Sequence, residues 1–451
     1  MASSSPPPPP PPMADANKGW GELPERCLGR ILRHLPCLLD HAAFADVCKR
    51  WRTIAGRNPP PMQPWLLKPS TAATSFFCVA CERNHQGPRM PDYARGARVC
   101  GSFPGGWVAV ADIPTIGGPA SPGNRSPALL NLCNGERVGL PRSLRDNNPR
   151  VTNINLVHTV ILSDDPSDSI GPYCAAAIVS GKPNIVFWRP GMSYWTPPML
   201  KWDAPMKKWK KLLPKDPIED VKYFVASALG VGFHVLTSNE DILVYAPSTN
   251  DKPRELTMSS VETYKVRRNR HPTMPEPGEV VARYLTQSRG KMLMVVRYVS
   301  AERTTMAFDV FRLERQPPSW SWKKLAPEAL TSLTIFLVQG SSVAVHSLLD
   351  ESERKPFPLS IYFLHDPVRF DDAGTSQSPQ IENPFPCSDA GRCRLFDQNI
   401  VHCLPREPPS DCSPWSWFFL PPNNAVRHLY SVEVIRELLG AGGRASASSS
   451  G

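Results

Sequence analysis

Two cysteines and a histidine lie close enough in the sequence to bind one metal ion. Cys78 and Cys81 are separated by two residues, and His85 follows four residues after the second cysteine. Thiolate sulfur and imidazole nitrogen are preferred zinc ligands, and such a spacing lets them share one ion. No second ligand pair stands at structural-site spacing, although Cys100 offers a fourth ligand.

The residues around these cysteines favour a different interpretation. Phe76, Phe77 and Val79 predict an apolar strand in which both cysteines simply pack, as buried thiols commonly do. We therefore predict no metal site and no cofactor.

Acidic residues also gather in one loop, at Asp164, Asp165 and Asp168. The segment Ser-Asp-Asp-Pro-Ser-Asp is typical of a turn and lacks the distal bidentate glutamate of a calcium loop. The chain contains no phosphate-binding glycine loop, no Gly-x-Ser-x-Gly elbow, no His-Glu-x-x-His motif and no Rossmann fingerprint. The sequence thus predicts no catalytic residues and no enzyme.

The chain carries a formal net charge of +10, which raises nucleic acid as a possible partner. Its basic runs are short, at Lys207–Lys211 and Lys265–Arg270, and neither lies in a recognisable nucleic-acid-binding motif. We predict solvated loops there, with a nuclear-import signal in the second run as a lesser alternative. A nucleic-acid scaffold remains a further hypothesis, marked by steep salt dependence of binding.

Near the N-terminus, apolar residues recur at the spacing of a helix. After Leu23 and Pro24, a first helix carries Leu28, Ile31, Leu32 and Leu35 and ends at Pro36. A second helix is predicted to begin near Asp40, to end at Gly56 and to present one apolar face: Phe44, Val47, Cys48, Trp51 and Ile54. Two short amphipathic helices have more apolar surface than they can bury internally, which predicts a partner.

From about residue 72 the pattern changes to short strands separated by Gly, Pro, Asn and Asp. The clearest runs are Trp107–Asp112, Leu156–Ser163, Ile185–Trp188, Ile242–Ala246, Met292–Val299, Ala307–Leu313 and Ile361–His365. A hairpin is predicted to turn at Ser288-Arg289-Gly290. About 350 residues of consecutive strands exceed one sandwich or barrel, and favour a mainly β fold with a β-propeller of about six or seven blades. The repeated Trp-Lys-Lys-Leu at residues 209 and 322 fits a blade terminus.

The termini are predicted to lie outside the folded domains. Residues 1–18 form a Ser/Pro-rich arm and residues 441–451 a small polar tail, and both are expected to be disordered. A Pro-rich linker is expected at 59–71 and a C-terminal helix at 423–440. No apolar stretch approaches the roughly 20 residues of a membrane span, and no signal peptide is recognised, so we expect an intracellular protein in the nucleus, the cytoplasm or both.

The helical segment, WGELPERCLGRILRHLP followed by DHAAFADVCKRWRTIAG, resembles an F-box, here over residues 19–58. F-boxes bind Skp1-like adaptors and through them a cullin. The resemblance implies that the adaptor is bound by these residues: Leu23, Pro24, Leu28, Ile31, Leu32, Leu35, Val47, Cys48 and Trp51.

The strand region carries a second resemblance. The landmarks are GSFPGGW from Gly101, PALLNL from Pro127, Ile161-Leu162-Ser163 and YLTQSRG from Tyr284. They are similar to those of a land-plant family in which an F-box precedes a KIB-type β-propeller, expected here over residues 72–422. The sequence departs from the family pattern at Asn131–Gly135 and Gly101–Phe103, in two loops.

These resemblances imply the substrate-recognition subunit of an SCF-type (Skp1-cullin-F-box) ubiquitin ligase, whose propeller binds an unknown target protein and catalyses nothing. The competing hypothesis is an orphan propeller that binds a ligand or acts as an enzyme without ligase assembly. Carboxylates or histidines converging at one rim of the propeller would favour it.

Overall fold

The computed structural model describes most of the chain in two units. The described residues are 20–35, 37–58, 63–70, 74–85, 90–111, 127–145, 151–154, 156–167, 173–181, 184–203, 208–211, 213–248, 256–268, 280–300, 304–316, 319–330, 333–346, 360–365, 389–404 and 413–420. One unit comprises Met1–Pro61 with Asn423–Gly451, and the other comprises Met62–Pro422. The predicted N-terminal arm, C-terminal helix and C-terminal tail lie outside the described residues.

In its described part, the first unit contains three short α-helices. A 3-10 turn, η1 (Trp20–Glu22), precedes α1 (Glu25–Arg33), α2 (Leu38–Asp46) and α3 (Lys49–Arg57). The sequence predicted one helix across the last two, and this prediction was wrong. Cys48 has extended backbone, with φ −164° and ψ 171°, so the chain turns between Val47 and Lys49. The turn lets α3 pack beside both α1 and α2.

The strands described in the second unit form six sheets of three to five strands, with two further two-stranded sheets. The first three blades are β29 (Ser416–Phe418), β1 (Trp65–Lys68), β2 (Ser75–Cys78) and β3 (Arg83–His85); β4 (Arg98–Phe103), β5 (Trp107–Ala111), β6 (Ala128–Asn131) and β7 (Arg137–Gly139); and β10 (Val157–Leu162), β11 (Ala175–Val179) and β12 (Ile185–Trp188). The two-stranded sheets are β8 (Ser143–Arg145) with β9 (Val151–Asn153), and β13 (Met199–Asp203) with β14 (Lys208–Lys211).

The remaining three blades contain four or five described strands each. They are β15 (Ile218–Phe224), β16 (Gly232–Thr237), β17 (Ile242–Pro247) and β18 (Met258–Tyr264); β20 (Val280–Ser288), β21 (Lys291–Val299), β22 (Thr305–Gln316), β23 (Ser319–Lys324) and β19 (Val266–Arg268); and β25 (Val343–His346), β24 (Leu333–Leu337), β26 (Ser360–Phe363), β27 (Gly391–Arg394) and β28 (Asn399–Val401). Short 3-10 turns lie between strands, at η2 (Asp92–Ala94), η3 (Pro104–Gly106) and η4 (Pro327–Leu330).

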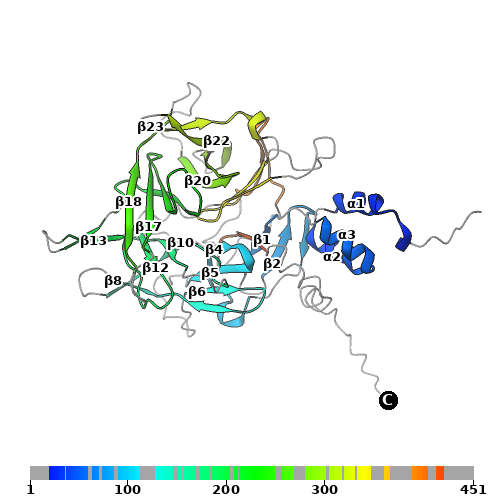
Figure 1. Cartoon of the computed structure of the whole chain (residues 1–451), viewed down its shortest axis with the longest axis horizontal. Helices are drawn as coiled ribbons and strands as arrows, with labels where there is room; N and C mark the ends of the chain where they lie inside the picture. The colour runs from blue at the N-terminus through cyan, green and yellow to red at the C-terminus, as the bar shows by residue number, and fades with distance from the viewer. Residues whose placement is uncertain are drawn as a thin grey trace, which may run out of the picture. The chain divides into compact units, whose positions relative to one another are not determined.

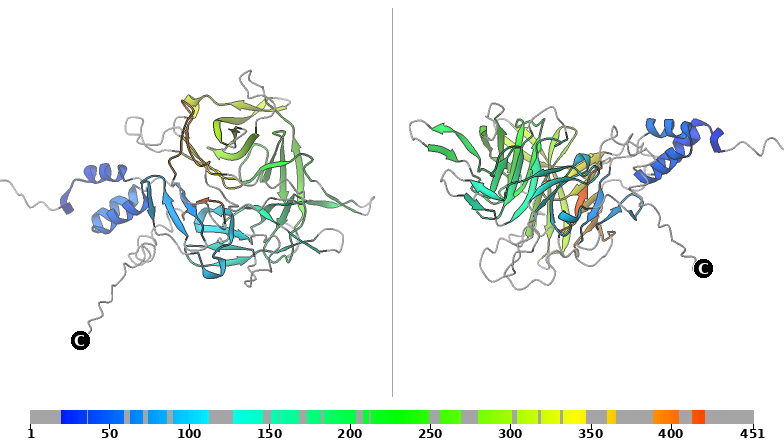
Figure 2. Two further views of the ribbon diagram at one scale, coloured as in Figure 1. Left: turned by 180° about the vertical axis from the view of Figure 1, so that it is seen from behind. Right: turned by 90° about the horizontal axis from the view of Figure 1, so that it is seen from below.

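The six sheets make a six-bladed β-propeller. Strands β29, β4, β10, β15, β20 and β25 contact one another in that order, so each blade contributes one strand to an inner ring. In Figure 1 the colour changes steadily around this ring, and Figure 2 shows the same arrangement from behind and from below. The fold class predicted from the sequence is confirmed, at the lower of the two blade numbers.

The first blade closes the ring with strands from both ends of the unit. Strand β29 pairs antiparallel with β1, and Leu66 lies opposite Trp417 in their register. The two strands are about 350 residues apart, so this pairing within the first blade ties the C-terminal end of the unit to its N-terminal end and holds the ring closed.

Both faces of the blades are covered by neighbours, which explains the continuous apolar runs. Strands β5, β11 and β12 are buried along their whole length. One aromatic cluster shows the packing between blades: Phe187 on β12 lies 5.4 Å from both Phe233 on β16 and Tyr245 on β17, ring centre to ring centre. A strand that is buried on both faces has apolar residues at consecutive positions, whereas a strand with one solvated face alternates apolar and polar residues.

The predicted hairpin between β20 and β21 is confirmed. Ser288 pairs with Lys291, so Arg289 and Gly290 form a two-residue turn with φ angles of 48° and 73°. Two successive positive φ angles match the twist of hairpin strands, and glycine adopts the second without strain. The Trp-Lys-Lys-Leu repeat is not a blade repeat, because Trp322 lies on outer blade strand β23 and Trp209 on the separate hairpin strand β14.

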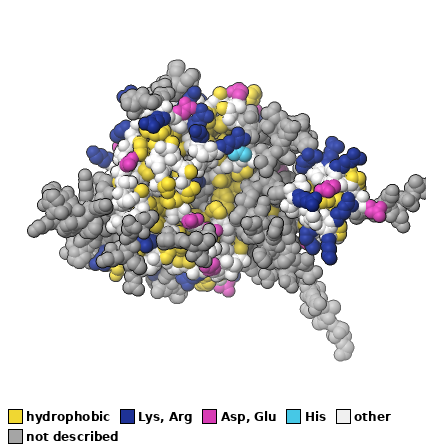
Figure 3. Space-filling model, viewed as in Figure 1, with side chains coloured by type: hydrophobic (Ala, Val, Ile, Leu, Met, Phe, Trp, Pro, Cys, Tyr) yellow, Lys and Arg dark blue, Asp and Glu magenta, His cyan; other side chains and the backbone are white. Residues whose placement is uncertain are grey.

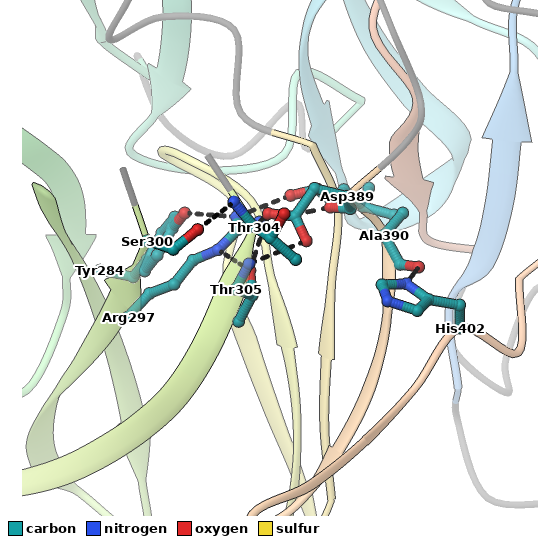
Figure 4. Close-up of polar contacts among 9 residues, drawn as sticks. Tyr284, Arg297, Ser300, Thr304, Thr305, Asp389, Ala390 and His402 are labelled. Carbon is teal, nitrogen blue, oxygen red and sulfur yellow. Dashed lines mark hydrogen bonds and ion pairs between the residues drawn. The ribbon is translucent and has the colours of Figure 1, made fainter. Parts of the chain in front are cut away.

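A buried ion pair joins the fifth and sixth blades (Figure 4). The guanidinium of Arg297 on β21 contacts the carboxylate of Asp389, just before β27, at 2.7 Å from Nη2 to Oδ2. Arg297 also donates from Nε to Thr305 Oγ1 at 2.8 Å and from Nη1 to the Leu364 carbonyl at 2.8 Å. The Asp389 carboxylate accepts the backbone N–H of Thr305 as well. Such bonds compensate the cost of taking both charges out of water.

Buried His234 on β16 predicts a pH-dependent stability. Burial lowers the pKa of His234 to about 4, against the opposing effect of its Nδ1–H bond to the Gly232 carbonyl. A histidine in the unfolded chain titrates near 6.5, so between these values the unfolded state binds a proton that the folded state does not. Stability therefore falls as pH drops through this window, by about 2 kcal/mol for this residue between pH 7 and pH 5.

Urea unfolding of the wild-type chain and of His234→Gln at both pH values measures this contribution. The glutamine amide can still donate to the carbonyl but does not titrate. The variant should therefore lose about 2 kcal/mol less than the wild type when the pH is lowered. Equal pH dependence in the two proteins would contradict the assignment.

Candidate functional site

The three helices of the first unit form a small core of their own. Leu28 and Leu32 from α1 pack with Phe44 from α2 and with Trp51 and Ile54 from α3. The rings of Phe44 and Trp51 lie 4.3 Å apart, centre to centre. This core is too small to cover all the apolar side chains that the helices carry.

The predicted adaptor-binding residues fall into three groups by exposure. Leu28, Leu32 and Trp51 are buried; Leu23, Ile31, Leu35 and Cys48 are half-buried; and Pro24 and Val47 are exposed. The buried residues hold the helices together, and the others place apolar atoms at the surface. The adaptor contact thus remains a prediction for the exposed and half-buried residues, and the buried ones would act through the fold.

Val47 has 54% of its surface exposed. It lies at the C-terminal end of α2, immediately before the extended residue that starts the turn into α3. Trp20 in η1 is exposed over 74% of its surface, and we did not predict it as a site residue. The sequence did contain a signal for Trp20: this tryptophan stands just before the first helix and outside its repeat of apolar residues.

Basic side chains dominate the charged surface of this unit. Residues 20–58 contain seven Lys or Arg and four Asp or Glu, and Figure 3 shows the dark-blue side chains spread over the helices. Among the acidic groups, Glu25 pairs with Arg57 at 3.1 Å and Asp46 pairs with Arg52 at 3.7 Å. The unit therefore combines exposed apolar side chains with an excess of positive charge, which suits a partner with an acidic surface.

In the second unit, a pocket lies among inner strands and nearby turns of the propeller. It is lined by Arg98, Val99, Cys100, Gly101, His158, Thr159, Tyr284, Leu337, Val338, Gln339, Ser341, Leu364, His365, Pro414, Trp415 and Ser416. Two histidines and one arginine contribute, but none of these lining residues is a carboxylate. A pocket without carboxylates lacks the acid and base pair that glycoside hydrolysis requires.

Cys100 lines this pocket, and burial decides whether its thiol can ionise. Its side chain is 5% exposed, and burial raises its pKa to about 12. At neutral pH it is therefore a protonated thiol and a weak nucleophile. The pocket offers no support for covalent catalysis at this residue.

Basic side chains in the second run are held by internal carboxylates. Of Lys265–Arg270, the structure describes residues 265–268. Lys265 pairs with Asp241, and Arg268 pairs with Glu240 at 2.9 Å from Nε to Oε2. Their charge is balanced within the propeller, which weakens the nucleic-acid hypothesis. The side chains of the other basic run lie outside the described residues.

The acidic loop behaves as the sequence predicted. The Asp164 side chain accepts the N–H of Asp165, and the Asp165 side chain accepts that of Ser167. These are turn contacts; Asp168 lies outside the described residues.

Cys78, Cys81 and His85 are brought together at the β2–β3 hairpin. Cys100, the fourth ligand offered by the sequence, is not part of this group. Among the helices that the structure describes, none has the length and apolar character needed to cross a membrane.

Comparison with known proteins relates both units to families. The F-box domain model matches residues 20–61, and the KIB1-4 β-propeller model matches residues 77–381. No curated protein matches the chain. Among solved structures, the N-terminal domain of Nup159 is 13% identical over 80% of this chain and 78% of that chain, with a TM-score of 0.23, too low to relate the two folds. The chain belongs to the family of proteins that join an F-box to a KIB1-4 β-propeller.

Proposed function

We propose that this chain is the substrate-recognition subunit of an SCF-type ubiquitin ligase. The F-box implies an adaptor role and binding to a Skp1-like protein. In the proposed assembly, the adaptor connects the helices to a cullin, and the propeller holds a target protein. The chain brings the target close to a separately recruited conjugating enzyme. It supplies no reacting group of its own.

The observation that carries the proposal is the apolar surface of the three-helix unit. Val47 and Pro24 are exposed while Leu23, Ile31 and Leu35 are only half-covered. Exposed apolar side chains on a unit of about 40 residues are costly in water and typically mark a binding surface. A helix-in-groove contact covers such side chains in one step.

Co-purification with the adaptor tests the proposal directly. The full chain, expressed with a Skp1-like adaptor, should elute as a one-to-one complex and should bind a cullin only when the adaptor is present. Elution of the folded chain alone, with every adaptor tried, would refute the ligase role and leave the orphan propeller as the better hypothesis.

On the propeller, an ordered loop offers a surface for the target. The segment between β15 and β16 exposes Val225 over 70% and Val231 over 53% of their surfaces. Side-chain bonds hold the loop in place: Gln287 donates to the Ala226 carbonyl at 2.7 Å, and the Ser227 hydroxyl oxygen accepts the Leu229 N–H at 3.1 Å. A rigid apolar loop loses little entropy on binding, which supports its use in recognition.

Changing both valines to aspartate should separate target binding from adaptor binding. Because both side chains are exposed, the double variant Val225→Asp/Val231→Asp should fold normally and retain the adaptor. Proteins retained by the wild type should be depleted at least about tenfold in the variant, measured by quantitative mass spectrometry and normalised to the recovered adaptor. An unchanged set of retained proteins would place the target surface elsewhere on the propeller.

A further inference from the structure

The β2–β3 hairpin of the first blade gathers two thiols and an imidazole. Cys78 ends β2, Cys81 lies in the four-residue connection, and His85 ends β3. The ligand atoms of these three residues lie within 4.8 Å of one another, and Cys81 Sγ is 3.1 Å from His85 Nε2. The cluster comes from one short segment, so forming the hairpin suffices to assemble it.

These separations suit a tetrahedral zinc ion. Zn–S bonds of about 2.3 Å and Zn–N bonds of about 2.0 Å place neighbouring ligand atoms about 3.5 to 3.8 Å apart. The three atoms therefore need to move by only a few tenths of an ångström, or at most about 1 Å, to surround one ion. Cys78 is 3% exposed and the other two residues are half-buried, so the site would be enclosed yet open to a metal from solvent.

The surrounding residues fix the orientation of the cluster. Glu82, directly after the second cysteine, has a φ of 54°, which reverses the chain and brings Cys81 back toward β3. The Trp65 ring lies stacked on the His85 ring, with centres 5.2 Å apart and planes 29° apart. A residue of β1 in the same sheet thus holds the imidazole in place, as outer contacts do for metal-binding histidines.

We propose that Cys78, Cys81 and His85 bind a zinc ion that fastens the β2–β3 hairpin in the first blade of the propeller. The sequence favoured cysteines packed in an apolar strand, because it does not reveal that the hairpin turns His85 Nε2 toward Cys81. Zinc requires a fourth ligand, which is water or another cysteine of the chain. Because β1 of the same sheet pairs with β29, the ion would strengthen the blade that closes the ring.

Metal analysis of the full chain tests this proposal without any variant. Protein purified under reducing conditions and without chelator should contain about one zinc per chain. After removal of zinc, added Co²⁺ should give the visible bands of a tetrahedral site and a thiolate charge-transfer band in the near ultraviolet. A chain that contains no zinc and gives no such cobalt spectrum would overturn the proposal and leave a thiol–imidazole hydrogen bond at this position.

Variants then assign the ligands. Cys81→Ser and His85→Gln should each lose the bound zinc, whereas Cys133→Ser, which replaces an exposed cysteine between β6 and β7 of the second blade, should retain it. Retention of zinc by both ligand variants would also overturn the proposal. The remaining cysteines are then replaced one at a time in the cobalt-loaded protein. A loss of charge-transfer intensity identifies a fourth thiolate ligand, and an unchanged spectrum in every variant assigns the fourth ligand to water. Neither measurement requires an adaptor, so its outcome is independent of the proposed ligase role.

Discussion

Replacing Val47 with aspartate is expected to weaken binding of a Skp1-like adaptor about thirtyfold or more, which corresponds to about 2 kcal/mol. The side chain is 54% exposed at the end of α2, so a charge there costs little in the free chain. In the proposed complex the same charge would be buried against apolar partner atoms without a counterion. Isothermal titration calorimetry of the full chain with purified adaptor measures the difference.

Two further variants separate binding from folding. Thr53→Asp places the same charge at an exposed position of α3 that is not assigned to the adaptor, and binding should stay within about threefold of wild type. Leu28→Ala removes a fully buried side chain and should cost about 2 to 5 kcal/mol of helix-unit stability, so adaptor binding should fall together with helical circular dichroism. Wild-type affinity in Val47→Asp would exclude this residue from the adaptor contact.

Replacing Asp389 with alanine is expected to destabilise the propeller by about 3 to 5 kcal/mol. The variant leaves the Arg297 guanidinium, 4% exposed, without its carboxylate partner. Its bonds to Thr305 and Leu364 go to neutral oxygen atoms, and its charge lies 4.9 Å from the centre of the Phe363 ring. A buried charge without a counterion costs more than the pair contributes when intact. Urea unfolding followed by tryptophan fluorescence measures the loss.

The charge-free double variant Arg297→Met/Asp389→Leu provides the control. Removing both charges together should cost clearly less than the sum of the single substitutions, because no unpaired charge is left. Arg297→Lys should also destabilise, since one ammonium group cannot reach the acceptors that the planar guanidinium contacts together. A loss below about 1 kcal/mol for Asp389→Ala would show that water reaches the pair.

The sequence alone determined much of the architecture, because local patterns carry it. Apolar spacing around Leu28 and Leu32 predicted the first helix, and the strand runs such as Ile185–Trp188 and Met292–Val299 all became strands. Turn chemistry at Arg289-Gly290 predicted the hairpin. Each of these signals depends on residues within a few positions of one another, where the backbone preferences of the residue types decide.

Local pattern did not determine where α2 ends and α3 begins. A stripe of Phe44, Val47, Cys48 and Trp51 fits one continuous helix, but packing against α1 favours a break at Cys48. The break buries Trp51 and leaves Val47 exposed, and exposure is what distinguishes a binding residue from a core residue. Binding residues and core residues have the same helical spacing, so the sequence alone assigned Val47 and Trp51 to the same face of one helix.

Only the tertiary structure decided which distant residues meet. The pairing of Arg297 with Asp389 spans 92 positions, and that of β1 with β29 spans about 350, so no local signal specifies them. Cys78, Cys81 and His85 were visible in the sequence as a possible ligand set, yet their meeting depends on the register of the β2–β3 hairpin. Residue types and spacing predicted the elements and the candidate ligands, and the hairpin register brought these ligands together. The closure of the ring determined which blades are neighbours, because contacts between blades depend on the whole chain having folded.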